Sequence, residues 1–278
     1  MKIKVGKLTF NLIIGKRSKK NLIPVIMIHG FGGNANDWNF IFKKLPDNFF
    51  YVAVDLIGHG KSASPKNPKY YSAEAIVNQL KSIFDILQLD KFILIGYSMG
   101  GRVALSYVSK YPDQIIALIL ESTSPGIINK NERIKRLNFD KQLSKSITKN
   151  NLKNFFADWY KQPIFSSLAK NTAVDLNKLI SGKLKSSATG LKNILTEFSP
   201  GTMPSYWSLL KKINFPVLLL NGSIDKKYNS INKRALKLLK YGTHKVIKGA
   251  GHNSHLEKPE DFIKFVNQFL KKYERTKK

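Results

Sequence analysis

The stretch GYSMGGR, residues 96–102, decides the fold of this chain. It lies between an apolar run at residues 91–95 and a segment at residues 102–111 whose apolar residues have helical spacing. Ser98 is therefore predicted to occupy a tight turn from a strand into a helix, where glycines let the two elements approach closely. Such a turn lifts the serine hydroxyl above a sheet and places helix N–H groups beside it. The pattern predicts an exposed nucleophile.

Strand-like and helix-like segments alternate on both sides of this turn. The strand-like runs are continuously apolar, which predicts burial on both faces, and helices between them predict a mostly parallel sheet. The strand-like runs lie within residues 3–14, 21–33, 49–55, 91–98, 114–122, 215–225 and 243–248. The helical segments lie at residues 34–45, 72–89, 100–111, 231–240 and 259–273. This order predicts the α/β fold class, with the sheet flanked by helices.

The alternation stops after the strand-like run at residues 114–122. Residues 122–210 are helical or irregular and contain no strand-like run. We therefore expect an α/β core formed by residues 1–121 and 211–278, with residues 122–210 inserted as a helical cap. A cap at this point would cover the carboxyl ends of the strands, where open α/β sheets bind their ligands.

Composition sets further limits on function. The chain has 278 residues, no cysteine, and a formal net charge of +29. Without cysteine, disulfides and thiolate metal sites are excluded, and the composition fits a reducing compartment, so we expect a cytoplasmic protein. Lysines interrupt the apolar N-terminal stretches and no stretch is long enough to cross a bilayer, so we expect an unprocessed protein without membrane insertion. The oligomeric state stays open, with a monomer favoured. The lysines are spread along the whole chain and no nucleic-acid-binding module is visible, so we expect no nucleic-acid partner. The histidines lack metal-ligand spacing and the glycines lack a phosphate-binding fingerprint, so no metal or organic cofactor is expected.

A serine nucleophile needs an imidazole base and a carboxylate that orients it. Asp225 ends the turn after one predicted strand, and His252 lies in a glycine-bordered loop after the last predicted strand. The order serine, acid, histidine is that of a catalytic triad on this type of sheet. His255 lacks the flanking glycine, and we expect it to pack locally.

The glycine-rich stretch HGFGG, residues 29–33, follows the first central strand. Its backbone is expected to aim the N–H of Phe31 into the site, where it would join the N–H of Met99 as an oxyanion hole. His29 and His59 are expected to be structural residues of their loops.

These motifs together resemble the α/β-hydrolase superfamily over nearly the whole chain. Four segments further resemble the synthases of 2-succinyl-6-hydroxy-2,4-cyclohexadiene-1-carboxylate, enzymes of menaquinone and phylloquinone biosynthesis. GYSMGGR is similar to the nucleophile segment of that family, and ESTSPGI (121–127) is similar to its Ser-Pro-Gly stretch, which an arginine follows. DWYKQPIF (158–165) and PSYW (204–207) resemble segments of its cap.

The resemblance implies a substrate with three carboxylates, from which a proton is removed beside a carbonyl and pyruvate is then expelled, without water or acyl transfer. Planar guanidinium groups suit such a ligand, and Arg102 and Arg133 are expected to bind it. Tyr97 is expected to add a hydrogen bond, or else simply to pack, and Trp159 is expected to add a ring surface.

One departure concerns the cap. The family usually has another arginine there, whereas this chain offers Lys183 and Lys185, and a lysine keeps the charge but loses the bidentate geometry. Two other functions stay open at this stage. One is a serine esterase or carbon–carbon bond hydrolase on the same scaffold, and the other is a non-catalytic ligand-binding protein.

Overall fold

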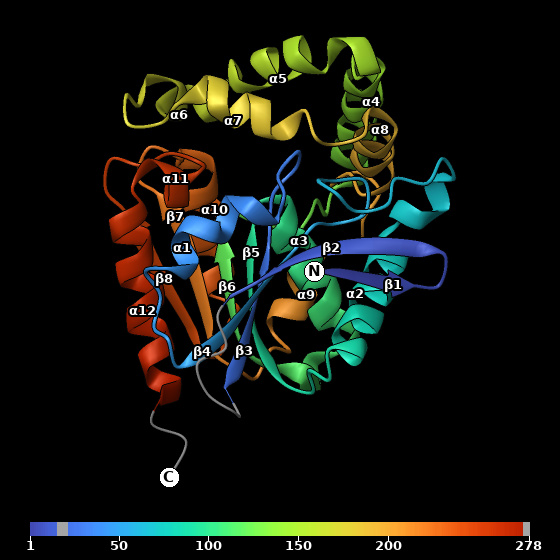
Figure 1. The fold of residues 1–278 in the computed structure, drawn as a ribbon. Helices are drawn as coiled ribbons and strands as arrows, with labels where there is room; N and C mark the ends of the chain where they lie inside the picture. The colour runs from blue at the N-terminus through green and yellow to red at the C-terminus, as the bar shows by residue number, and fades with distance from the viewer. Residues whose placement is uncertain (16–21, 275–278) are drawn as a thin grey trace.

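The computed structural model describes residues 1–15 and 22–274 of the chain. The described strands form one eight-stranded sheet in the order β1-β2-β4-β3-β5-β6-β7-β8 (Figure 1). They are β1 (Lys2–Val5), β2 (Leu8–Ile14), β3 (Ile23–Ile28), β4 (Phe49–Val54), β5 (Phe92–Tyr97), β6 (Ile115–Glu121), β7 (Val217–Gly222) and β8 (Gly242–Ile247). The pairs from β4 to β8 are parallel, and the β1–β2 and β2–β4 pairs are antiparallel. The predicted fold class is confirmed.

Helices cover both faces of this sheet. The α-helices are α1 (Asn39–Phe42), α2 (Ala73–Ile86), α3 (Met99–Lys110), α4 (Lys130–Lys145), α5 (Leu152–Tyr160), α6 (Ser166–Lys170), α7 (Leu176–Lys183), α8 (Ala188–Glu197), α9 (Trp207–Leu210), α10 (Lys226–Leu236), α11 (Ser254–Glu257) and α12 (Pro259–Glu274). Side chains of α2, α3, α9 and α10 join one apolar cluster with the sheet, and side chains of α12 join a second cluster on the other face. Since both faces are covered, strands such as β5 and β7 are buried along their whole length, as their continuous apolar sequences predict.

Helices α4 to α8 lie above the carboxyl ends of the parallel strands (Figure 1). They carry an apolar cluster of their own, centred on Phe155, Phe156 and Leu168. This helical segment contacts the sheet domain closely where Gly190 of α8 meets Gly58. A Cβ on Gly190 would lie 2.4 Å from the Gly58 Cα, so the two backbones can approach only because both residues are glycine. From Ile194 onward the chain packs mainly on the sheet cluster, before the boundary expected at residue 210.

Two elements differ from the sequence expectation. The first predicted strand is a hairpin, β1 and β2, since Gly6 adopts a φ of +55° between them. Helix α10 begins at Lys226 rather than Ile231, because the Asp225 side chain accepts a hydrogen bond from the Tyr228 N–H and caps the helix.

Candidate active site

The nucleophile turn joins β5 to α3 and depends on its glycines. Ser98 has a φ of +51°, in the left-handed region that non-glycine residues rarely adopt. A methyl group on Gly100 would lie 2.2 Å from the carbonyl oxygen of Ile28, and one on Gly101 would lie 1.9 Å from the Oγ1 of Thr123. Helix α3 can therefore approach β3 and β6 only because these positions lack a side chain.

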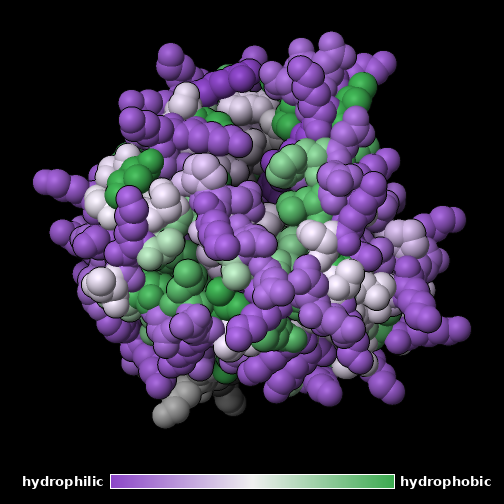
Figure 2. Space-filling view, turned by 90° about the horizontal axis from the view of Figure 1, so that it is seen from above, coloured by the Kyte–Doolittle hydropathy of each residue, from purple (hydrophilic) through white to green (hydrophobic). Residues whose placement is uncertain are grey.

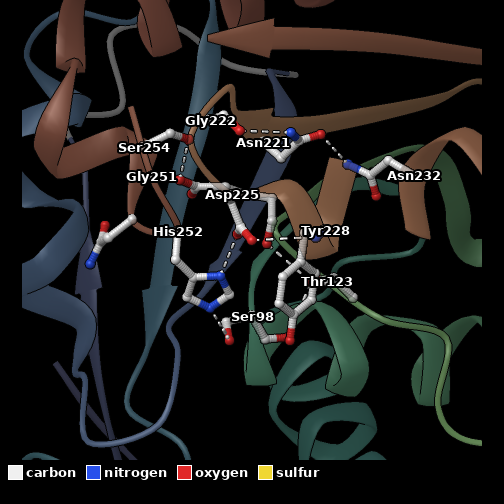
Figure 3. A network of polar contacts seen from close by, with 12 residues as sticks. Ser98, Thr123, Asn221, Gly222, Asp225, Tyr228, Asn232, Gly251, His252 and Ser254 are labelled. Carbon is white, nitrogen blue, oxygen red and sulfur yellow. Dashed lines mark hydrogen bonds and ion pairs between the residues drawn. The ribbon is translucent and has the colours of Figure 1, made fainter. Parts of the chain in front are cut away.

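Three side chains from distant parts of the chain meet above this turn (Figure 3). The His252 Nε2 lies 3.0 Å from the Ser98 Oγ, and the His252 Nδ1 lies 2.8 Å from the Asp225 Oδ2. An ionised carboxylate only accepts hydrogen bonds, so Nδ1 carries the proton and Nε2 is left to accept the Ser98 hydroxyl. Asp225 and His252 are both buried. The structure thus brings together the three residues that the sequence singled out.

Packing fixes the imidazole in this position. The ring of Tyr228, from the first turn of α10, lies with its centroid 4.7 Å from that of His252. The loop before the imidazole passes close to the helical segment, because a Cβ on Gly251 would be 1.9 Å from the Ser167 Oγ. The residue that caps α10 and the helix that it caps therefore both contact the same histidine.

The expected oxyanion donors lie beside the serine. Phe31 and Met99 line the same cavity as Ser98. Neither backbone N–H donates to an acceptor among the described residues, and Met99 is the first residue of α3, where helical N–H groups have no partner within the helix. A developing negative charge near Ser98 would meet these two donors.

A cavity of about 1100 Å³ opens in front of Ser98 and His252. On the face seen from above the helical segment, hydrophilic residues cover most of the surface and hydrophobic residues gather near the centre (Figure 2). The cavity lining includes the exposed apolar residues Ile128, Phe139 and Ile224. Its cationic lining residues are Arg102, Arg136, Lys226, Lys227 and Arg234. Three carboxylates, Glu132, Asp140 and Asp225, also line the cavity, so it carries a small excess of positive charge, unlike a purely apolar ester pocket.

Arg102 lies in the first turns of α3 and faces this cavity. Its Nη1 donates to the carbonyl oxygen of Phe198 at 2.9 Å, and its guanidinium lies 5.4 Å from the centre of the Phe198 ring. Burial, and secondly the positive charge of Arg136, lower the pKa of Arg102 to about 10. No carboxylate of the described residues forms an ion pair with Arg102, so this guanidinium is available to an anionic ligand.

The second arginine expected at the site lies elsewhere. Arg133 donates to the carbonyl oxygen of Thr202 at 3.1 Å and does not line the cavity. Arg136, one turn further along α4, lines it instead. The two arginines stand in one basic segment, NERIKR at residues 131–136, and only the helix phase, which the sequence left undetermined, decides which one faces the cavity. Lys227 is a further cation that sequence reasoning missed, and burial followed by Arg136 lowers its pKa.

The two expected aromatic residues have different surroundings. Trp159 is half-buried, lines the cavity and stacks near Phe31 with ring centroids 4.9 Å apart. Tyr97 lies outside the lining of the large cavity, with its ring between those of His252 and His255. Burial, and then nearby Glu121, raise the pKa of Tyr97 well above its usual value. Tyr97 also lines a small cavity that Ser98 borders, so the hydrogen-bonding and the packing roles both stay predictions.

The two cap lysines also separate. Lys183 is buried and lines a small cavity of about 30 Å³ beside Ser98, with its Nζ 3.4 Å from the Gly32 carbonyl oxygen and 3.8 Å from the Asp37 carboxylate. Burial alone would lower the pKa of Lys183, but Tyr160 and Asp37 outweigh it and raise the pKa. Lys185 is exposed and lines neither cavity.

The remaining histidines are packed and hydrogen-bonded. His29 accepts from the Leu56 N–H at 3.1 Å, and its Nδ1 lies 2.8 Å from the Gly30 carbonyl oxygen. His255 binds Glu121, a fully buried carboxylate at the end of β6 that also accepts the Ser254 hydroxyl. Glu121 carried no motif signal, since only the fold brings the end of β6 beside the histidine loop.

Two features are absent from the described residues. Within residues 1–15 and 22–274, no group of three or more histidine, aspartate or glutamate side chains is placed to hold a metal ion. No helix in the same ranges is both long and apolar enough to cross a bilayer.

Comparison with known proteins agrees with this geometry. A family profile described as "alpha/beta hydrolase fold" matches residues 23–259. The chain belongs to the α/β-hydrolase family. Among its relatives are the 2-succinyl-6-hydroxy-2,4-cyclohexadiene-1-carboxylate synthases, to which its sequence is similar over most of its length.

Three relatives define that similarity. A Bacillus subtilis (strain 168) protein, whose name assigns it provisionally as such a synthase, is 40% identical over 88% of this chain and 89% of its own length. The synthase of Serratia proteamaculans (strain 568) is 29% identical over 88% of this chain and 92% of its own. The solved structure of MenH from S. aureus is 30% identical, has a TM-score of 0.89 and is matched over 95% of this chain and 99% of its own.

Proposed function

We propose that this protein is a carbon–oxygen lyase that eliminates pyruvate from 2-succinyl-5-enolpyruvyl-6-hydroxy-3-cyclohexene-1-carboxylate in menaquinone or phylloquinone biosynthesis. The product would be the cyclohexadiene carboxylate after which its relatives are named. The observation that carries the proposal is the meeting of a Ser98–His252–Asp225 hydrogen-bonded chain with the Arg102–Arg136 pair in one cavity. A hydrolase of neutral esters needs the first of these but has no use for the second.

The proposed mechanism uses the triad for proton transfer. His252, oriented by Asp225, draws the proton from the Ser98 hydroxyl, so that the serine oxygen can remove the substrate proton beside the carbonyl. The N–H groups of Phe31 and Met99 would then hold the enolate-like oxygen that develops. Electrons from the broken C–H bond form the new ring double bond as the C–O bond to the enolpyruvyl group breaks. This group leaves as the enolate of pyruvate and takes the proton held by His252 on its CH2 carbon, which gives pyruvate, while the Ser98 oxygen keeps the proton removed from the substrate.

Cations of the cavity would bind the carboxylates of this substrate. Arg102 and Arg136 present guanidinium groups, which match carboxylates through paired hydrogen bonds. Their mutual repulsion, which contributes to the lowered pKa of Arg102, would be relieved by an anion placed between them. Trp159 would cover the ring of the substrate from the helical segment. We propose that residues 122–210 act as a cap over a core formed by residues 1–121 and 211–278.

The test is release of pyruvate by the purified protein from the enolpyruvyl substrate. Ser98→Ala removes the oxygen that takes the substrate proton and Arg102→Ala removes a guanidinium from the cavity lining, so each is expected to lower kcat/KM by about a hundredfold or more. Unchanged unfolding temperatures would show that the losses are chemical. Full activity of the Arg102→Ala protein would contradict the proposed substrate class.

The rival reading is a serine esterase or carbon–carbon bond hydrolase, which the same hydrogen-bonded chain would serve. Burst kinetics with a nitrophenyl ester would favour that activity, because covalent attack accumulates an acyl-enzyme. Pyruvate release without turnover of such esters would exclude it as the main activity. Tight binding of the substrate with no turnover at all would instead favour the ligand-binding protein.

We also propose that the enzyme works as a cytoplasmic monomer on a diffusible substrate.

A further inference from the structure

Helix α4 buries a single residue, Asp140, and that residue is charged. The Asp140 side chain is 1% exposed. Its Oδ2 accepts hydrogen bonds from the Arg136 Nε at 2.8 Å and from the Ser199 Oγ at 2.5 Å. Its Oδ1 is buried and has no hydrogen-bond partner among the described residues. A buried carboxylate destabilises a fold unless it is well paired, so the position of this aspartate requires an explanation.

Asp140 fixes the guanidinium of Arg136 by one edge. The bond to Nε leaves the two Nη groups as a fork, and they donate to no acceptor among residues 1–15 and 22–274. Glu132, Arg136 and Asp140 follow at four-residue spacing on one face of α4, and all three line the large cavity. The orientation of the Arg136 side chain is thus set from within the cavity wall.

Two consecutive residues, Phe198 and Ser199, hold both cavity arginines in place. The Phe198 carbonyl oxygen accepts from Arg102, and the next residue, Ser199, donates to Asp140 and through it fixes Arg136. Ser199 is itself 1% exposed. The two guanidinium groups, one from α3 and one from α4, are therefore positioned against the same two residues.

We propose that Asp140 is a positioning residue for substrate recognition, which holds Arg136 so that its fork and that of Arg102 bind carboxylate groups of one substrate. This inference rests on the proposed function. The proposal predicts the direction in which anion binding changes when the Asp140 charge is removed. If Asp140 acted only through its negative charge, Coulomb repulsion would weaken anion binding, and removal of the charge would strengthen it. If Asp140 positions Arg136, removal of the charge weakens anion binding.

The experiment compares two substitutions on the same helix that remove the same charge from the cavity lining. Asp140→Asn is expected to weaken binding of succinate, measured by calorimetry, and to raise KM for pyruvate release, each about tenfold, while kcat changes little. Glu132→Gln is the matched control. It is expected to leave succinate affinity and KM unchanged, or else to strengthen succinate binding and lower KM. Succinate binding as tight in Asp140→Asn as in the unmodified protein would overturn the proposal.

A double-mutant comparison shows whether Asp140 acts through Arg136. In an Arg136→Gln background, Asp140→Asn is expected to have no further effect on succinate binding, and a second, equal loss would overturn the proposal. This comparison also serves if Asp140→Asn alone fails to fold, because Arg136→Gln has already removed the partner. Succinate binding that follows this pattern without any pyruvate release would reject the proposed lyase function and keep the positioning role.

Discussion

At the scale of single residues, Glu121 connects the nucleophile turn at Ser98 to the loop that carries His252. Its backbone carbonyl accepts from the Ser98 N–H at 2.9 Å, and its carboxylate binds the Ser254 hydroxyl and both the backbone and the ring of His255. Ser254 and His255 directly follow the loop that carries His252. One buried side chain therefore ties the histidine loop to the strand beside the nucleophile.

Replacing the Glu121 carboxylate should lower the stability of the protein. Glu121→Gln exchanges one acceptor oxygen for an NH2 group, which leaves a buried donor of Ser254 or His255 without its acceptor, and we expect the free energy of unfolding to fall by about 3 kcal/mol. Urea denaturation followed by circular dichroism would measure it. Asp158→Asn breaks the exposed pair with Lys161 and should cost less than about 1 kcal/mol. Equal losses in the two variants would contradict this account.

At the scale of elements, the approach of α3 to the sheet places the nucleophile. The hydroxyl of Thr123, just after β6, lies 3.1 Å from the carbonyl oxygens of both Ser98 and Glu121, between which its one proton is shared. Thr123 also occupies the space beside Gly101. The helix is therefore seated by a threonine on one strand and by the backbone of β3 near Gly100. This close packing gives the strained serine its fixed position.

A methyl group at Gly101 should push α3 away from β6. We expect Gly101→Ala to lower the free energy of unfolding by about 1–3 kcal/mol, because the added carbon overlaps Thr123. Since the serine moves with its helix, kcat should fall as well. Gly182→Ala in α7 is the matched control: its Cβ would have no neighbour within 4 Å, so helix propensity should make it neutral or slightly stabilising. Thermal unfolding and turnover of both proteins would decide.

At the scale of the whole molecule, the described structure combines a sheet covered on both faces with a helical layer that has its own apolar cluster. The cavity lies where these parts meet, so residues from both contribute to it. Two buried histidines, His29 and His59, lie near this junction with ring centroids 4.9 Å apart. Burial is the main cause that lowers the pKa of each below its usual value of 6.5.

These histidines make stability depend on pH. Since the folded protein holds both imidazoles neutral, the unfolded chain binds more protons once the pH falls below about 6.5. The free energy of unfolding is therefore expected to fall as the pH decreases from about 7 to 5. His59→Gln removes one of the two histidines that bind protons in the unfolded chain but not in the folded protein. The unfolding temperature of this variant should therefore change less between pH 7 and pH 5. Identical slopes for both proteins would assign the effect to other groups.

The sequence by itself determined the fold class and singled out the three residues of the candidate triad. Continuous apolar runs, the glycines around Ser98 and the order of Asp225 and His252 are local signals, because steric limits at a tight turn and burial of a parallel strand act on neighbouring residues. Only the tertiary structure decided which cations face the cavity. Arg133 and Arg136 differ by about one helical turn, and the packing of α4 against α8 sets which of them points inward. The pairing of Asp140 and of Glu121 also joins residues far apart in the chain, where no spacing in the sequence records that they meet.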